Sequence, residues 1–359
     1  MKNKMSILMA MALLLLWSGC TGEVFTETEP VVPSDGRAIV FDNGFVDNSV
    51  RTRATTPLSQ HHVTMGVWGW ETNPSGVDNL LFVNQLVKYL GTDGDANDWT
   101  YNPLKYWNDG NKYRFYAYAP HDSTHVSIDA ANGRISIRDI VLSGANLQQS
   151  ASDALKDNFH GSGDTDWMVA RGGQAVPGTY RAKVNFNMNH ILAKFVAAVR
   201  IGSDLANDPE KPQVTVTGLT IGHFASKGSF VQQFDHTPNP EDSTEMALPE
   251  WTLDETAMPY DLVNDSVVTA QETNTYLVES LLLPQTVDST AEMKLSYTIA
   301  YSDGRTERFV RTMDLDEAFG HFCGGCCYTV TFTVNPRAIS FDSGVSTWQN
   351  EYGGGTALE

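Results

Sequence analysis

The residues of this chain best suited to chemistry are three cysteines near its C-terminal end, in the stretch CGGCC. Cys323 and Cys326 form a C-x-x-C pair, a spacing shared by redox dithiols and by half of many zinc sites. A zinc site needs a second pair of ligands, and only His321 stands nearby in the sequence. A redox pair normally opens a helix, whereas this one leads into the strand pattern at 328–334. A local disulfide or free thiols, Cys327 included, on a structural turn are therefore favoured over a redox or metal centre.

A second candidate is an acidic stretch, DGDAND, that begins like a calcium-binding loop. Asp93, Asp95 and Asn97 occupy alternate positions, as the ligands of such a loop do. The sixth position, where the loop needs glycine, is Asp98, and the twelfth, where it needs a bidentate glutamate, is Leu104. We interpret the stretch as a solvated acidic turn.

The remaining polar candidates form no recognisable catalytic set. Asp164 and Asp166 in GDTD are as doubtful as metal ligands as the acidic stretch is. His121 and His125 would share a face only on a helix, and we expect both histidines at the surface. The chain contains no nucleophile elbow, no phosphate-binding glycine loop and no HExxH motif. The sequence thus predicts no enzyme, no cofactor and no metal.

Charge and aromatic content narrow the class of partner. The 359 residues carry 24 Lys plus Arg against 43 Asp plus Glu, a net charge of −19, which argues against nucleic acid and anionic lipid as partners. Four tryptophans, Trp68, Trp70, Trp99 and Trp107, could stack on sugars at a wet surface. Most of them lie on alternating strand patterns, which favours core packing over ligand stacking.

The first twenty residues have the pattern of a lipoprotein signal. Lys2 and Lys4 precede an apolar run at 5–17, which makes roughly 20 Å of helix, too short for a bilayer core of about 30 Å. Small residues then lead to Cys20, which we expect to be cleaved, acylated and anchored in a membrane by its lipids. Trp17 departs from the aliphatic residue usual at that position, so an ordinary secretory signal is the alternative.

From residue 38 onward the pattern is that of an all-β protein. Segments 113–119, 293–301 and 328–334 alternate apolar and polar residues, which predicts antiparallel strands with one buried and one wet face. The segment at 80–90 is ambiguous, and we interpret it as a strand. Further strands are expected at 38–41, 63–70, 135–140, 183–188, 214–221 and 275–283, and short helices at 151–159 and 314–319.

Many short strands separated by Gly, Pro, Asn and Asp imply β-sandwiches, and the polar, proline-containing segment 202–213 is the best internal boundary. The expected organisation is a signal peptide at 1–19, a lipidated tether with a removable first strand at 20–53, sandwich domains at 54–205 and 206–348, and a flexible tail at 349–359.

Several motifs, in this order, make the chain resemble the fimbrillin family of Bacteroidota, which supplies type V pilus subunits. They follow the leader that ends at Cys20, and they are RTRATT (51–56), WTYNPLKYWNDGNKYRFYAYAP (99–120), DWMVARGG (166–173), NHILAKFVAAVRI (189–201), SLLLPQ (280–285), YTVTFTV (328–334) and ISFDSGVSTWQ (339–349). The resemblance implies two tandem transthyretin-like Greek-key β-sandwich domains, exported as a lipoprotein precursor to the outer membrane and cell surface.

The resemblance also gives a role to the two arginines in SVRTRATT. In family members that polymerise, an Arg-specific protease removes the first strand, and a strand from another subunit fills the vacated groove. Here the removable strand would be 38–45, the next strand 63–70, and the processing site Arg53 or Arg51, in an exposed linker. The expected partners are other pilus subunits, the protease, and ligands on host or bacterial surfaces. The alternative is a stand-alone surface lipoprotein that binds glycans or host ligands through exposed aromatic residues.

Overall fold

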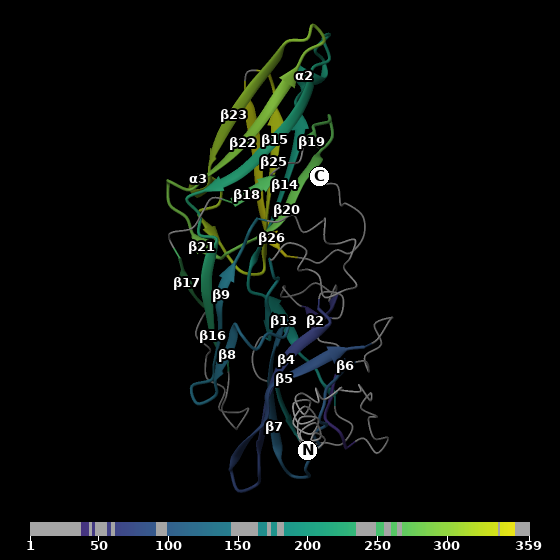
Figure 1. Cartoon of the computed structure of the whole chain (residues 1–359), viewed down its shortest axis with the longest axis vertical. Coiled ribbons are helices and arrows are strands. Elements are labelled where there is room, and N and C mark those ends of the chain that lie inside the picture. The colour runs from purple at the N-terminus through teal and green to yellow at the C-terminus, as the bar shows by residue number, and fades with distance from the viewer. Residues whose placement is uncertain are drawn as a thin grey trace, which may run out of the picture. The chain divides into compact units, whose positions relative to one another are not determined.

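The computed structural model is an all-β structure, as the alternating patterns predict (Figure 1). It describes residues 37–42, 45–46, 56–58, 62–90, 99–144, 164–170, 174–177, 183–234, 249–254, 260–263, 268–336 and 338–348. Two four-residue helices lie in these segments, α2 (Ser203–Ala206) and α3 (Leu315–Ala318), and α3 falls on the predicted 314–319. Within the described part of the chain, neither helix is long or apolar enough to cross a membrane.

The largest sheet has nine strands in the order β3-β2-β13-β10-β7-β4-β5-β6, with β11 also paired to β7. Its strands are β2 (Phe45–Val46), β3 (Thr56–Pro57), β4 (Thr64–Thr72), β5 (Asp78–Tyr89), β6 (Trp99–Thr100), β7 (Lys112–Ala119), β10 (Met168–Ala170), β11 (Gln174–Pro177) and β13 (Asn187–His190). The ambiguous segment 80–90 is therefore a strand, as predicted.

Strand β7 differs from the prediction, because both of its faces are buried. Tyr116 and Tyr118, expected on a wet face, are fully buried. The cover on that side includes Phe234, which follows β16 (Lys227–Gln233) and stacks on Tyr116 with ring centroids 4.4 Å apart. Periodicity misses this second layer because the covering residue comes from more than a hundred positions later.

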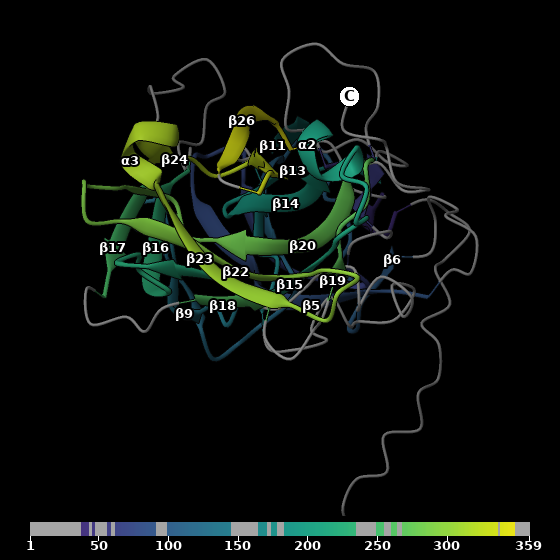
Figure 2. The same ribbon diagram turned by 90° about the horizontal axis from the view of Figure 1, so that it is seen from above.

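Two further sheets contain most of the C-terminal half (Figure 1). One has the order β20-β14-β25-β26, from β14 (Ala193–Ile201), β20 (Thr275–Leu282), β25 (Cys326–Val334) and β26 (Ile339–Thr347). The other has the order β18-β15-β22-β23, with β19 also on β15, from β15 (Gln213–Gly222), β18 (Tyr260–Val263), β19 (Val268–Thr269), β22 (Glu292–Ala300) and β23 (Thr306–Asp314). Seen from above, β14 and β20 lie in one layer and β15, β22 and β23 in the other (Figure 2).

The pairing in the β20-β14-β25-β26 sheet is mixed, although the sequence predicts antiparallel strands, whereas the other sheet is antiparallel throughout its described pairs. Strand β14 runs parallel to β25 over eight residue pairs. Parallel neighbours need a long crossover, and here the chain builds the strands of the other sheet between them.

The remaining strands form smaller sheets. A four-stranded sheet has the order β17-β16-β9-β8, from β8 (Val126–Asp129), β9 (Arg134–Val141), β16 and β17 (Glu250–Leu253). Two-stranded sheets join β1 (Val40–Phe41) to β12 (Lys183–Val184), and β21 (Gln285–Thr286) to β24 (His321–Phe322). Strands from the two sides of the expected boundary at 205/206 pair with each other, β9 with β16 and β14 with β20. The division into two domains stays a prediction.

Gly69 on β4 offers a test of this packing. A Cβ added there would lie 2.6 Å from the ring of Phe82 and 2.9 Å from that of Phe115. We expect Gly69→Ala to lower the free energy of unfolding by about 1–3 kcal/mol, because these rings are held in the core. The matched control is Gly222→Ala, whose Cβ would meet Glu292 at an ordinary 3.6 Å, with a change of about 0.5 kcal/mol or less. Urea unfolding measures both; equal effects would contradict the packing.

Candidate functional site

Residues 38–42 of the predicted removable strand, which the structure describes, lie with Ala38, Ile39 and Phe41 in the core and are bonded along both edges. On one edge, the N–H of Ile39 donates to the carbonyl of Lys105, and the N–H of Trp107 donates to the carbonyl of Arg37, each at 2.9 Å. On the other edge, β1 runs parallel to β12. The side chain of Ile39 is fully buried. The strand therefore fills a groove between two other segments of the chain.

The centre of this groove is an aromatic socket around Phe41. The Phe41 ring is fully buried and packs against four other rings, at centroid distances of 5.4 to 5.9 Å. These rings belong to Phe82, Tyr101, Phe115 and Phe186. Because they come from separate elements, loss of Phe41 would open a cavity that no single neighbour can close.

Tyr101 adds a polar contact to the socket. Its hydroxyl donates to the carbonyl of Ile39 at 2.8 Å, and burial raises the pKa of the Tyr101 phenol well above its usual value. The phenol therefore stays protonated and remains a donor to the first strand.

A buried carboxylate shapes the rim of the groove. Glu71 on β4 is 8% exposed, and its Oε1 accepts hydrogen bonds from Asn108 Nδ2, Asn111 Nδ2 and the Tyr113 hydroxyl at 2.5, 2.6 and 2.8 Å. Burial pushes the pKa of the Glu71 carboxyl upward, but the three hydrogen bonds outweigh burial, and the pKa lies below its ordinary value. The loop that carries Asn108 and Asn111 follows directly on residues 105–107, whose backbone bonds to Arg37 and Ile39. Glu71 therefore holds one wall of the groove in place.

The predicted processing and lipidation residues lie outside the described residues. Arg51 and Arg53 fall in the connection 47–55, between β2 and β3, which pair antiparallel with each other. Cys20, the acidic stretch from Asp93 to Asp98 and the predicted helix 151–159 also lie outside. The cleavage and the lipid anchor therefore stay predictions.

A repeat that the pattern analysis missed links the first strand to the last one. Residues 37–44 read RAIVFDNG and residues 337–344 read RAISFDSG, identical at six of eight positions and numbered 300 apart. Ile339 and Phe341 thus correspond to Ile39 and Phe41. A comparison of the chain with itself at fixed offsets would have found this signal.

The same motif has a different environment at its second position. Strand β26 is the edge strand of its sheet, bonded only to β25 among the described strands. Phe341 is 40% exposed and Val345 is 57% exposed. The isoleucine and phenylalanine that are fully buried in the first copy are thus only partly buried in the second, where Ile339 packs against the core and Phe341 is partly open to solvent.

The cysteines form the structural turn that the sequence favours. Cys323 and Cys326 are joined in a disulfide, and the turn leads into β25. Burial raises the pKa of the Cys327 thiol, which makes it a poor nucleophile. Among the described residues, no three His, Cys, Asp or Glu side chains lie close enough together to hold a metal ion.

Two other candidates occupy positions that the sequence did not predict. Asp164 and Asp166 are 1% and 2% exposed, so they are core residues, where the analogy with the acidic stretch suggested a solvated turn. Asp164 accepts a backbone N–H from Ser143, and Asp166 Oδ1 lies 2.8 Å from His190 Nδ1. His125 is partly exposed, as expected, and bonds to Asp122.

The four tryptophans pack in the core, as the strand patterns favour. Trp68, Trp70, Trp99 and Trp107 are all less than 10% exposed. Their rings are therefore closed to a sugar at the surface, and the glycan alternative has no support from them.

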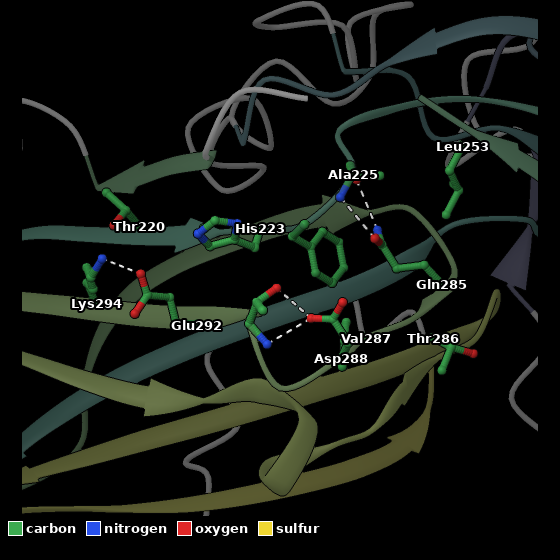
Figure 3. Close-up of a pocket in the computed structure, with 13 residues that line it drawn as sticks. Thr220, His223, Ala225, Leu253, Gln285, Thr286, Val287, Asp288, Glu292 and Lys294 are labelled. Carbon is green, nitrogen blue, oxygen red and sulfur yellow. Dashed lines mark hydrogen bonds and ion pairs between the residues drawn. The ribbon is translucent and has the colours of Figure 1, made fainter. Parts of the chain in front are cut away.

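A second concave site is a polar pocket of about 640 Å³ next to β21 and β22 (Figure 3). Asp288 accepts hydrogen bonds from Thr290, and Lys294 pairs with Glu292. The Gln285 amide bonds to both backbone groups of Ala225. The polar groups that line this pocket thus bond mainly to one another, and these residues form no catalytic arrangement of side chains.

Comparisons with known proteins agree with the all-β architecture. A family model described as fimbrillin-like matches residues 52–348. A fimbrial protein from Bacteroides vulgatus is similar in fold, with a TM-score of 0.58 and 17% identity over 87% of this chain and 100% of that one. A protein from Bacteroides uniformis, described provisionally as a cell adhesion protein, has a TM-score of 0.49 and 14% identity over 89% of this chain and 100% of its own. No curated protein matches the sequence.

The aromatic socket predicts the effect of truncating Phe41. We expect Phe41→Ala to lower the free energy of unfolding by about 3–5 kcal/mol, because the surrounding rings cannot collapse into the space. The control is Val40→Ala on the same strand, where the side chain is only half-buried and a loss below about 1.5 kcal/mol is expected. Urea titrations of both variants measure the difference, and a loss for Phe41→Ala no larger than the control's would place the strand outside the core.

The lowered pKa of Glu71 predicts a dependence on pH. Its contribution to stability is fully present above the carboxyl's unfolded pKa and is lost as the pH falls through the lower folded-state pKa. Glu71→Gln should lower the free energy of unfolding by about 1–3 kcal/mol at pH 7, because charge-assisted hydrogen bonds become neutral ones. The difference from the wild type should shrink as the pH falls towards the folded-state pKa.

Urea unfolding at several pH values measures this effect. Glu250→Gln, at an exposed position of β17, is the control and should leave stability nearly unchanged. A Glu71→Gln effect that stays constant with pH would mean that the charge is not what holds the rim.

Proposed function

The chain belongs to the fimbrillin-like family, and on that premise we propose that it is a pilus subunit that assembles by exchanging its first strand. The precursor would be anchored through acylated Cys20 at the outer membrane and then exposed on the cell surface. An Arg-specific protease would cut after Arg53 or Arg51 and release the first strand. The role is assembly and adhesion, without catalysis, in contact with other subunits and with host or bacterial surfaces.

The repeated motif carries this proposal. A subunit without its first strand would present unpaired backbone groups beside an empty aromatic socket, an arrangement that proteins avoid. Filling the positions of Ile39 and Phe41 contributes about 3–6 kcal/mol gross, at about 1.5–3 kcal/mol for each side chain. Main-chain hydrogen bonds along both edges add to this, against the cost of association.

The same chain carries a segment suited to that vacancy. Strand β26 presents an isoleucine and a phenylalanine at the spacing of the first strand, and its Asp342 matches Asp42. Phe341 is 40% exposed at a sheet edge, so it would bury more surface in the vacant socket, where Phe41 is fully buried, than it buries on its own subunit. We therefore assign β26 of a second copy as the donor strand.

Proteolysis followed by assembly tests the proposal. Treating the purified precursor with an Arg-specific protease should give one discrete cut near Arg51 or Arg53, followed by oligomers whose size grows with protein concentration. Phe341→Ala should abolish the oligomers after cleavage. Because Phe341 is 40% exposed, the variant subunit should lose only about 1–2 kcal/mol of its own stability, less than the loss expected for the fully buried Phe41.

The matched control is Ser340→Ala, which changes the opposite face of β26 and should assemble like the wild type. Size-exclusion chromatography with light scattering follows the oligomers. Resistance to the protease, or a cut that leaves stable monomers, would support the alternative of a stand-alone surface lipoprotein. Assembly that is equally strong in Phe341→Ala would exclude β26 as the donor.

A further inference from the structure

Strand β26 is held on its own subunit in two different ways. Along its length, most of its side chains are exposed, and it is held by the backbone pairing with β25, by Ile339, which packs partly buried against the core, and by an ion pair between Asp342 and Arg200 at 3.3 Å. At its end, Trp348 is 4% exposed. The repeat does not extend to this residue, because the position numbered 300 lower is Asn48. Trp348 is therefore not part of the motif that β26 shares with the first strand, and its burial needs a separate explanation.

Trp348 is fixed on its ring and on its backbone. Its indole stacks on the imidazole of His190 with centroids 3.7 Å apart and an angle of 11° between the planes. Its backbone N–H donates to the carbonyl of Gly325 at 2.9 Å. The ammonium group of Lys194 lies 5.9 Å from the centre of the indole.

The His190 side of the site that holds the Trp348 ring is rigid. The side chain of His190 is fully buried, and its Nδ1 lies 2.8 Å from Asp166 Oδ1. The carbonyl of Asp166 in turn lies 2.8 Å from Nε2 of His62, which precedes β4. The imidazole that Trp348 stacks on is thus held in one orientation by a buried polar chain.

The other side of the seat is the turn that the disulfide closes. The N–H of Gly325 donates to the carbonyl of Leu192 at 2.8 Å, so the turn lies against the start of β14. A Cβ at Gly324 would come within 2.5 Å of the Ile191 carbonyl oxygen, so this close approach requires glycine. The Cys323–Cys326 disulfide closes the loop that presents both glycines.

We propose that Trp348, seated between His190 and the disulfide-closed turn, is a latch that retains β26 on its own subunit until a neighbour's groove is free. That Trp348 retains β26 on its own subunit does not depend on the proposed function. That β26 is retained until a neighbour's groove is free rests on the proposed function. The latch accounts for how a strand with exposed apolar side chains stays bound before assembly. It also gives the cysteine turn a role that needs no redox or metal chemistry.

Hydrogen–deuterium exchange on the full, uncut chain tests the latch without any assembly step. Trp348→Ala should raise the exchange rate of the β26 amides bonded to β25 by roughly tenfold or more, and leave β4 and β7 unchanged. Trp348→Phe, which keeps an aromatic ring on His190, should recover most of the protection. Trp251→Ala removes an aromatic side chain from a different sheet and should leave β26 as in the wild type.

A second variant keeps the test decisive if Trp348→Ala does not fold. Cys323→Ser with Cys326→Ser leaves Trp348 in place, opens the turn, and should also raise β26 exchange. Exchange in β26 within about twofold of the wild type in the variants that fold would overturn the latch. A rise spread evenly over all strands would overturn it as well.

Assembly separates the two proposals. After cleavage, Trp348→Ala subunits should elongate several times faster than the wild type, because donor release is easier. Faster β26 exchange without any oligomers would leave the latch standing and remove the proposed function. Normal oligomers with unchanged β26 exchange would support the proposed function and overturn the latch.

Discussion

The structure depends on one constraint: the groove around β1 must be filled by a strand that brings an aromatic ring to its centre. Backbone groups on both edges are bonded to this strand, and the Phe41 ring touches four others. An unfilled groove would leave both kinds of group facing water, so the chain needs either its own first strand or a substitute. Glu71 and Tyr101 serve the same constraint, because they hold the wall and bond to the strand.

Much of the fold could be predicted from alternation alone, and the failures have physical reasons. Alternation reports that one face of a strand is apolar, but it does not report what covers the other face. For strand β7, alternation predicts a wet face, but Phe234, far along the chain, covers the side carrying Tyr116. Alternation does not report strand direction either, and the parallel partner of β14 is separated from it in the sequence by the strands of another sheet.

The parts of the candidate site differ in how far they could be predicted from the sequence. Strand 38–41 and its apolar residues followed from local pattern, whereas the rim did not, because Glu71 and its three donors meet only in the folded chain. Spacing and compartment predict a structural turn at the cysteines with either a local disulfide or free thiols, and the structure shows the disulfide between Cys323 and Cys326. The motif shared by 37–44 and 337–344 is visible in the letters but has no periodicity, so strand reasoning passes over it.

Under the proposed function, the two copies of this motif would let one sequence support both a stable subunit and a polymer. In the first copy, Ile39 and Phe41 are fully buried, while in the second Phe341 remains 40% exposed at a sheet edge. The second copy therefore has apolar surface left to bury, and burying that surface in a vacant groove, as the proposed assembly requires, would lower the free energy. This difference in burial between the two copies would also favour premature association, because an exposed apolar edge strand is a template for pairing. The chain needs a local restraint whose contacts are not part of the motif, and the buried stack of Trp348 on His190 meets that requirement.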